Sequence, residues 1–294
     1  MRVTHLGQHH AALARITGSL SDFAAAQNQA ASGKRLHRPS DDPSAMAQAL
    51  ELRASLGTSE QAARNADDGE LWVNLADTKL QSAIDQLQRA KELAIRGATF
   101  TNADERAAIA AEVVQLRETL VSLANTHHQG RGLFSGFDAG DAVAKVAGTW
   151  TYQGDAGQVN RRIGDTEVVA VNVTAYEAFG FSGGKDVFTV LDDLETALIS
   201  NDQSGIDAGI NEVQASMDTV LNNLTTLGAV GARIEGAQLR IGEDISNIRA
   251  QLSALEDVDL AEAVMEMQLQ ESAYTAALSA FARTGQTSLV DFLR

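Results

Sequence analysis

Few residues in this chain have types and spacings that could support chemistry. His5 and His9 lie one helical turn apart, a spacing that can chelate a metal ion, and His127 and His128 are adjacent in what we expect to be a solvent-facing loop at a helix end. No carboxylate completes a site in the first turn, and the chain has no H-E-x-x-H motif. We therefore interpret the histidines as ordinary polar residues and predict no metal site and no cofactor.

One glycine-rich loop and one pair of carboxylates are also of types that could bind phosphate or act in acid–base catalysis. The stretch GFSGGK, residues 180–185, is one residue short of a phosphate-binding G-x-x-x-x-G-K loop, and Asp186 stands where a magnesium-binding hydroxyl would be needed. A turn that leads into a helix explains it better. Asp41 and Asp42 directly precede Pro43, a position that favours helix capping over acid–base catalysis. We predict no catalytic residues.

Composition excludes several classes of protein. The 294 residues are 44% hydrophobic but only 5% aromatic, which favours long helices packed side by side over a thick enzyme core. The formal net charge is −16 and no run of basic residues occurs, so we expect no binding to nucleic acid. The absence of cysteine excludes disulfides and thiolate metal sites. No apolar segment fits a cleaved secretory signal or a membrane span, so these signals alone predict a cytoplasmic protein without membrane insertion.

Both prolines of the chain fall in one segment, SGKRLHRPSDDPSAM, at residues 32–46. A glycine that tolerates left-handed dihedrals, followed by two basic residues that suit the negative end of a helix dipole, predicts a helix end. The first proline predicts an extended turn, and the second fits the first position of a new helix with an aspartate as its N-cap. Asp41 should add negative charge at the start of that helix. The residues of this turn and helix start are Gly33, Arg35, Pro39, Asp41, Asp42 and Pro43.

Periodicity predicts helices at about 7–32, 43–98, 102–127, 185–200, 204–256 and 259–284. An interruption of the second helix near Gly57 or Gly69 is left open. Glycine-bounded alternations in TWTYQGDAG and EVVAVNVTAYEAFG predict strands in a small β-containing insertion at about 136–184. The fold class is therefore mainly α, an antiparallel long-helix bundle with a small β-rich insertion. We divide the chain into a terminal coiled-coil region (1–35 and 257–294), a helical bundle (36–135 and 185–256) and the outer insertion (136–184).

The two terminal helices carry apolar residues at the three- and four-residue spacing of a coiled-coil seam. We expect these helices to pair antiparallel, and to keep part of the seam unburied until neighbouring subunits cover it. The predicted assembly interface consists of Leu6, Leu13, Ile16, Leu20, Phe23, Leu260, Val264, Met267, Tyr274, Leu278 and Phe281.

The segment ASGKRLHRPSDDPSAMAQALELRASL, residues 31–56, resembles the N-terminal segment of the flagellin-like family. Its PSDDP resembles the hook-associated branch of that family, whereas flagellins typically continue with DDAAG. Further similarities are LANTHHQGRGLFSGF (123–137), YQGDAGQVNRRIG (152–164) and SLVDFLR (288–294), so the resemblance covers nearly the whole chain in order. His37 and Arg38 depart from the more usual neutral residues.

The resemblance implies a secreted structural subunit, not an enzyme, at the hook–filament junction of the bacterial flagellum. Its implied partners are other copies of itself in a ring, the first hook-associated protein, flagellin, an export chaperone and the flagellar type III export apparatus. Two alternatives stay open. A short flagellin would form the filament itself, and an enzyme would use the insertion at 136–184 as its active domain.

Overall fold

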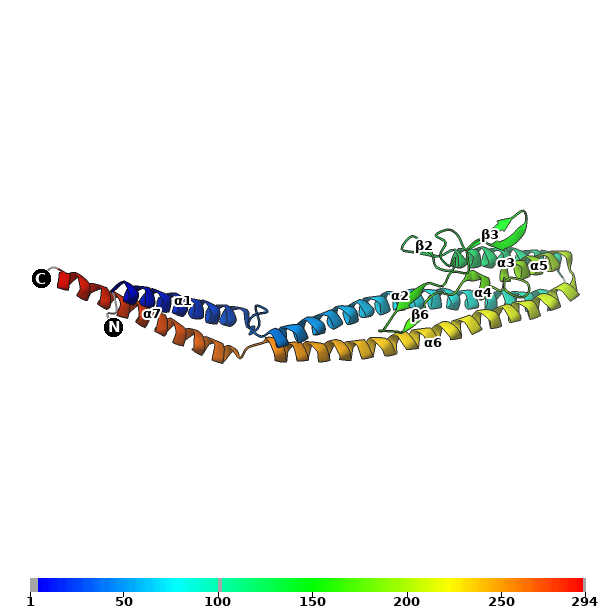
Figure 1. Cartoon of the computed structure of the whole chain (residues 1–294). Helices are drawn as coiled ribbons and strands as arrows, with labels where there is room; N and C mark the ends of the chain where they lie inside the picture. Colours follow the sequence, from blue (N-terminus) through cyan, green and yellow to red (C-terminus); the bar gives the residue numbers. More distant parts are fainter. Residues whose placement is uncertain (1–4, 100–101, 293–294) are drawn as a thin grey trace. The chain divides into compact units, whose positions relative to one another are not determined.

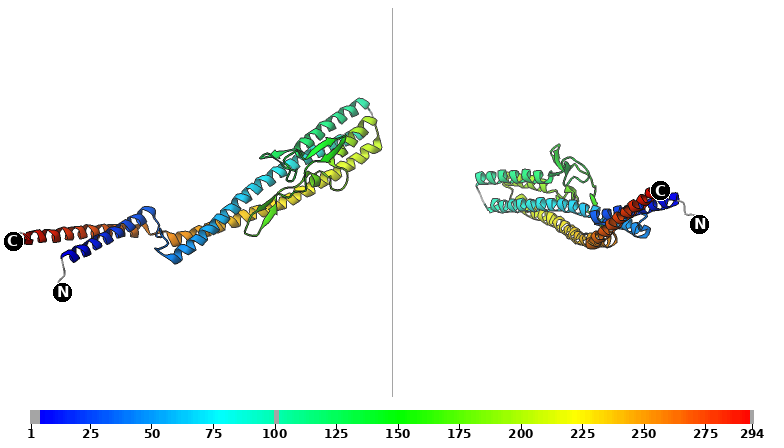
Figure 2. Two further views of the ribbon diagram at one scale, coloured as in Figure 1. Left: turned by 45° about the horizontal axis from the view of Figure 1, so that its top comes forward. Right: turned by 90° about the vertical axis from the view of Figure 1, so that its left-hand side faces the viewer.

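A computed structural model describes the backbone of residues 5–99 and 102–292, and the side chains of residues 7, 10–99 and 102–282. The described part contains seven helices, shown in Figures 1 and 2. They are α1 (His5–Ser32), α2 (Pro43–Thr99), α3 (Ala103–Ala124), α4 (Ala175–Ala178), α5 (Val187–Ser200), α6 (Gln203–Glu256) and α7 (Leu260–Phe292). The fold is mainly α, as the sequence predicts.

The chain forms two compact units, and α2 and α6 run through both. One unit comprises Met1–Gly57 with Ile245–Arg294, and the other comprises Thr58–Asp244. The three-part division made from the sequence stays a prediction. The helix α2 is uninterrupted at Gly57 and Gly69. At Gly69 an added Cβ would lie 3.1 Å from Cγ1 of Val171. Glycine at this position therefore allows the segment around Val171 to pack closely against α2.

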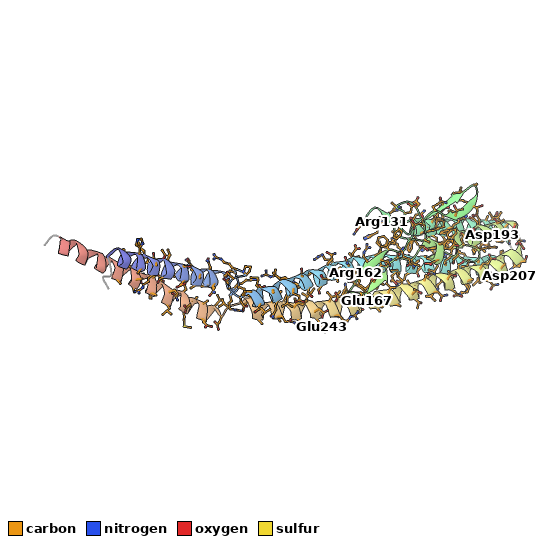
Figure 3. All side chains as sticks on the ribbon, in the orientation of Figure 1. Arg131, Arg162, Glu167, Asp193, Asp207 and Glu243 are labelled. Atoms are coloured by element: carbon orange, nitrogen blue, oxygen red, sulfur yellow. The ribbon has the colours of Figure 1, made fainter. Side chains whose placement is uncertain are left out.

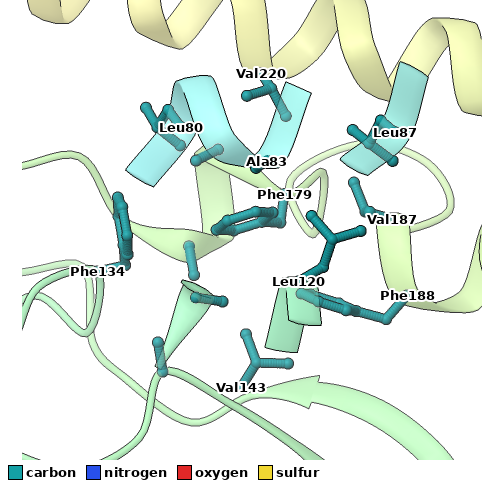
Figure 4. Close-up of a cluster of buried hydrophobic side chains, with 14 of the residues drawn as sticks. Leu80, Ala83, Leu87, Leu120, Phe134, Val143, Phe179, Val187, Phe188 and Val220 are labelled. Atoms are coloured by element: carbon teal, nitrogen blue, oxygen red, sulfur yellow. The ribbon is translucent and has the colours of Figure 1, made fainter. Parts of the chain in front are cut away.

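The unit of residues 58–244 is organised around one hydrophobic core, part of which Figure 4 shows. Buried α6 side chains recur every seven residues, so one stripe of this long helix is covered, and all of its members except Ile241 belong to this core. This stripe is Ile206, Val213, Val220, Leu227, Ile234 and Ile241. Helices α2, α3 and α5 supply the facing residues, among them the fully buried Leu80, Leu87, Leu120 and Leu191. Residues of 136–184 join this same core, including Phe179.

The β structure of the described residues consists of three separate antiparallel hairpins. They pair β1 (His127–His128) with β2 (Arg131–Gly132), β3 (Val143–Val146) with β4 (Thr149–Tyr152), and β5 (Asn160–Arg162) with β6 (Val168–Ala170). The strands expected in both alternating segments are therefore present. The end of the second segment was wrongly assigned, because residues 175–178 form the short helix α4, capped by the side chain of Thr174.

Charged side chains attach the β5–β6 hairpin to the helices, and Figure 3 shows the region around Arg162 and Glu167. Nε of Arg161 lies 2.6 Å from a carboxylate oxygen of Asp68 on α2. Glu167 pairs with Arg233 at 3.3 Å and with Arg240 at 3.0 Å, both on α6. These contacts position the hairpin over the two long helices.

Candidate assembly interface

The two terminal helices, α1 and α7, pack against each other in antiparallel orientation (Figures 1 and 2). The rings of Phe23 and Tyr274 stack with centroids 6.4 Å apart and an interplanar angle of 2°. The residues between the helices are buried or half-buried and recur at alternating spacings of four and three. This seam consists of Ala12, Ile16, Ser19, Phe23, Ala26 and Ala30 on α1, and of Ala263, Met267, Gln270, Tyr274, Ala277 and Phe281 on α7.

The predicted interface residues divide into two groups. Five lie in the seam, and five others have exposed fractions between 39% and 58%. Those in the seam are Ile16, Phe23, Met267, Tyr274 and Phe281. The exposed ones, which we name the leucine flank, are Leu13, Leu20, Leu260, Val264 and Leu278. The side chain of Leu6 lies outside the described residues.

Helix geometry places the leucine flank on one side of the pair. At about 100° per residue, Leu13 and Leu20 lie roughly a quarter turn from the α1 seam, and the flank residues of α7 lie roughly a quarter turn from theirs in the same sense. In an antiparallel pair, equal senses of rotation point to the same side. Since Phe23 faces Tyr274, Leu278 lies at the level of Ser19, beside Leu20. Leu13, Leu20 and Leu278 therefore form one exposed apolar patch. Val264 and Leu260 lie on the same side of α7 but farther along the helix, beyond the exposed Glu271.

The helix α1 carries little charge around its whole circumference. Apart from histidine, its 28 residues contain only Arg15 and Asp22 as ionisable side chains. The rest of the chain is strongly acidic overall. A nearly uncharged helix with exposed leucines is typical of a surface that becomes covered in an assembly.

A backbone clamp connects the end of α1 to the α6–α7 connection. Gly33 adopts φ +68°, and its carbonyl accepts a hydrogen bond of 3.0 Å from the amide of Val258. The amide of Arg35 donates to the carbonyl of Glu256 at 2.6 Å, so Lys34 and Asp257 form an antiparallel bridge. The left-handed backbone predicted for Gly33 is present and turns the chain into this clamp.

The turn that follows is stabilised by its two aspartates. Asp42 is the predicted N-cap of α2, which begins at Pro43, and its carboxylate accepts from the amide of Ala45 at 3.0 Å. Asp41 has a further role, because one of its oxygens accepts from the amides of His37 at 3.1 Å and Arg38 at 2.8 Å. These backbone hydrogen bonds hold the pKa of Asp41 below its ordinary value. Asp41 thus closes the turn around Pro39.

Arg35 acts on a different helix from the one expected. Its guanidinium donates to the carbonyl of Leu255 at 3.0 Å, close to the end of α6, and lies 3.7 Å from the carboxylate of Asp42. The sequence places Arg35 near the end of α1, and that proximity suggested a favourable interaction with the dipole of α1. The observed hydrogen bond joins the turn to the far end of the chain.

Glu256 is the centre of the clamp, and no local signal in the sequence singles it out. Its side chain is 5% exposed and lies 2.8 Å from Nζ of Lys34 and 2.8 Å from a guanidinium nitrogen of Arg53. Burial raises the pKa of Glu256, but the hydrogen bonds from the two cations outweigh burial and hold the pKa below its ordinary value of 4.5. The carboxylate is therefore ionised at neutral pH.

We expect the clamp to weaken in acid. Because the pKa of Glu256 is lower in the folded chain, its contribution to stability is complete above 4.5 and is lost as the pH falls through the folded value. The variant Glu256→Gln should lower the protection of the Arg35 and Val258 amides at neutral pH by about 1.5 kcal/mol, since both cations are half exposed. Amide hydrogen exchange measures this, with the exposed Glu51→Gln as control; equal protection in both variants would contradict it.

Several of the residues first considered for chemistry serve packing, capping or ion pairing. The His128 ring packs edge-on against Trp72, with centroids 5.6 Å apart and a buried Nε2, so the solvent-facing position predicted for His128 is wrong, whereas His127 is exposed as predicted. Asp186 caps α5 through the amides of Phe188 and Thr189, which confirms that GFSGGK leads into a helix. Lys185 of that loop pairs with Asp193 and Glu212, at 2.8 and 3.0 Å.

The described residues provide neither a cluster of metal ligands nor a helix that could span a membrane. Within the described side chains, no group of three or more His, Asp or Glu residues could bind a metal ion. The side chains of His5 and His9 lie outside the described residues. No described helix has the length and apolar character needed to span a bilayer.

The two ends of the chain match known sequence families. Residues 3–139 match the bacterial flagellin N-terminal helical region, and residues 210–293 match the bacterial flagellin C-terminal helical region. The chain belongs to the flagellin family. The α1–α7 pair and the clamp are therefore formed by the two regions that match the family, with residues 140–209 between them.

Individual members of the family resemble this chain over most of its length. Flagellar hook-associated protein 3 of Salmonella typhimurium is 25% identical, and the similarity covers 96% of each chain. A flagellin of Halalkalibacterium halodurans is 26% identical over 82% of this chain and 80% of its own. The structure of the flagellar junction protein FlgL from Legionella pneumophila has the same fold, with a TM-score of 0.61 and 15% identity over 71% of this chain and all of that one.

Proposed function

We infer that this chain is a structural subunit of the bacterial flagellum and forms the ring at the junction between hook and filament. The observation that carries this conclusion is the exposed leucine flank on a helix pair built from the two ends of the chain, both of which match the flagellin family. A relative that matches over 96% of each chain and is named flagellar hook-associated protein 3 supports the position within the flagellum. The resemblance of PSDDP to the hook-associated branch agrees with it.

Burial of the flank would contribute to assembly. Covering a side chain of this size completely contributes about 1.5–3 kcal/mol. The five flank residues keep between 39% and 58% of their surface exposed in the single chain. Covering that remaining surface on assembly would therefore contribute roughly half of the free energy of complete burial for each residue. Several kcal/mol per subunit then oppose the entropy lost when subunits associate.

The partners follow from this position. Within the ring each copy contacts other copies, while the first hook-associated protein adjoins one side and flagellin the other. We further propose delivery by an export chaperone through the flagellar type III export apparatus. We assign no catalytic role to the segment 136–184, whose described side chains contribute to the common core.

Immunogold labelling of intact flagella tests the proposed position. Labelling of this chain should give one band where hook meets filament, because a ring occupies one short section of the tube. The likeness to the Halalkalibacterium halodurans flagellin supports the rival function, a filament-forming subunit. Label along the whole filament would favour the rival and contradict the junction.

Deleting the gene for this chain distinguishes the junction protein from the filament-forming flagellin in a second, independent way. Without a junction protein, cells should release flagellin into the medium because the filament has no base to grow on. Without a flagellin, the hooks should be capped and little flagellin shed.

A further inference from the structure

The outer side of α1 carries a groove of about 540 Å³. Ala24, Ala25 and Asn28 of α1 line it together with His37 and Arg38 of the following turn. At about 100° per residue these α1 positions lie roughly half a turn from the seam, so the groove faces away from α7. Its floor consists of small side chains, which leave room for larger ones to enter.

The outer side of α7 carries two protruding apolar side chains. Met265 and Leu269, one helical turn apart, are 64% and 62% exposed, and both lie roughly half a turn from the α7 seam. Neither belongs to the leucine flank or to the interface predicted from the sequence. Glu262 and Glu266 border this protruding pair, so the surface is apolar at its centre and acidic at one edge.

The groove and the protruding pair lie at the same level along the α1–α7 pair. Phe23 stacks on Tyr274, and the carbonyl of Gly33 accepts from the amide of Val258. Counting back from Tyr274 places Leu269 opposite Asn28 and Met265 opposite Ser32, within the length of the groove. One helix pair therefore presents a groove on one outer side and a matching protrusion on the other.

We propose that Met265 and Leu269 of one copy of this chain fill the α1 groove of the next copy. The groove is lined by one base, Arg38, and one acid, Asp41, whose carboxylate is held by the backbone amides of His37 and Arg38, so Arg38 is the group that pairs with the acidic edge of the protrusion. Arg38 at the groove makes no ion pair within the described part of the chain, and neither does Glu262 beside the protrusion. Because the two surfaces are different and lie on opposite sides, the contact repeats from copy to copy and builds a ring or a tube. The inference rests on the proposed function and names the surfaces through which the copies meet.

Engineered cysteines test this contact, since the chain has no cysteine of its own. We would replace the chain in a flagellated strain by Ala25→Cys/Leu269→Cys, confirm incorporation by immunogold labelling, and oxidise the intact flagella. Each copy then carries one cysteine in the groove and one on the protrusion, so denaturing gels without reductant should show a ladder of dimers, trimers and larger species. The control is Ala25→Cys/Glu271→Cys, where position 271 is exposed but about 200° around the helix from Leu269.

The outcomes separate this inference from the proposed function. An incorporated variant that gives no ladder, or the same ladder as the control, overturns the contact while the position at the junction stands. Cross-links to flagellin or to the first hook-associated protein would show another occupant of the groove and also overturn it. Label absent from the junction would contradict the proposed function itself.

Charge reversal tests the same contact without cysteine. Arg38→Glu should lower incorporation about tenfold, because like charges then face each other across the contact. Adding Glu262→Arg to Arg38→Glu should restore incorporation, whereas Glu262→Arg alone should lower it. A double variant no better than the singles would contradict the pairing, whatever the cross-linking shows.

Discussion

Replacing Leu20 or Leu278 with aspartate should block incorporation of this chain into flagella. The two residues are 46% and 41% exposed in the single chain and lie side by side in the leucine flank. A charge buried without a partner in an apolar contact costs several kcal/mol, and each ~1.4 kcal/mol is a factor of ten in association. We therefore expect at least about a hundredfold less incorporated protein. Quantitative immunoblots of purified flagella measure this.

Two controls separate assembly from folding. Leu20→Met keeps the size and apolar character of the side chain and should incorporate normally. The purified aspartate variants should unfold at the same temperature as the unsubstituted chain in the unit of residues 58–244, to which neither position belongs. Aspartate variants that still build normal junctions would contradict the role of the leucine flank.

Replacing Phe188 with alanine should strongly destabilise the unit of residues 58–244. The Phe188 side chain is fully buried, and its ring centroid lies 5.4 Å from that of Trp150, 5.6 Å from Phe179 and 6.1 Å from Phe181. Removing such a ring leaves a cavity and costs about 3–5 kcal/mol, a large part of the 5–15 kcal/mol by which domains are typically stable. The midpoint of urea unfolding should fall accordingly.

The matched control is Leu239→Ala on α6, in the same unit. Leu239 is 68% exposed, so its replacement should change the free energy of unfolding by no more than about 0.5 kcal/mol. Similar losses in the two variants would show that the aromatic cluster does not hold this unit together.

Local chemistry made much of the fold predictable. Gly33, Asp42 and Pro43 act through the backbone of their immediate neighbours, and the helix end and helix start that they predict are present. The long helices were predictable for the same reason, because their periodicity is contained in each segment. The short helix α4 was missed, since its four residues are too few to show a period and the preceding strand suggested a continuation.

The face by which α1 meets α7 was not contained in the sequence of either helix alone. Hydrophobicity placed Leu13 and Leu20 in the seam, but the structure places Ala12 and Ser19 there and leaves the leucines exposed. Small side chains allow two helix backbones to approach closely, and this advantage exists only when the partner helix is present.

The amino-acid sequence by itself determined where the long helices lie, the turn at residues 33–43 and the resemblance to the flagellin family, because each depends on neighbouring residues or on motifs kept in order. Only the tertiary structure decided that Glu256 binds Lys34 across 222 residues of chain, and that α1 and α7 turn a groove and a protrusion to opposite sides. Such contacts join segments far apart in the sequence, and their energy depends on distances that no local pattern records.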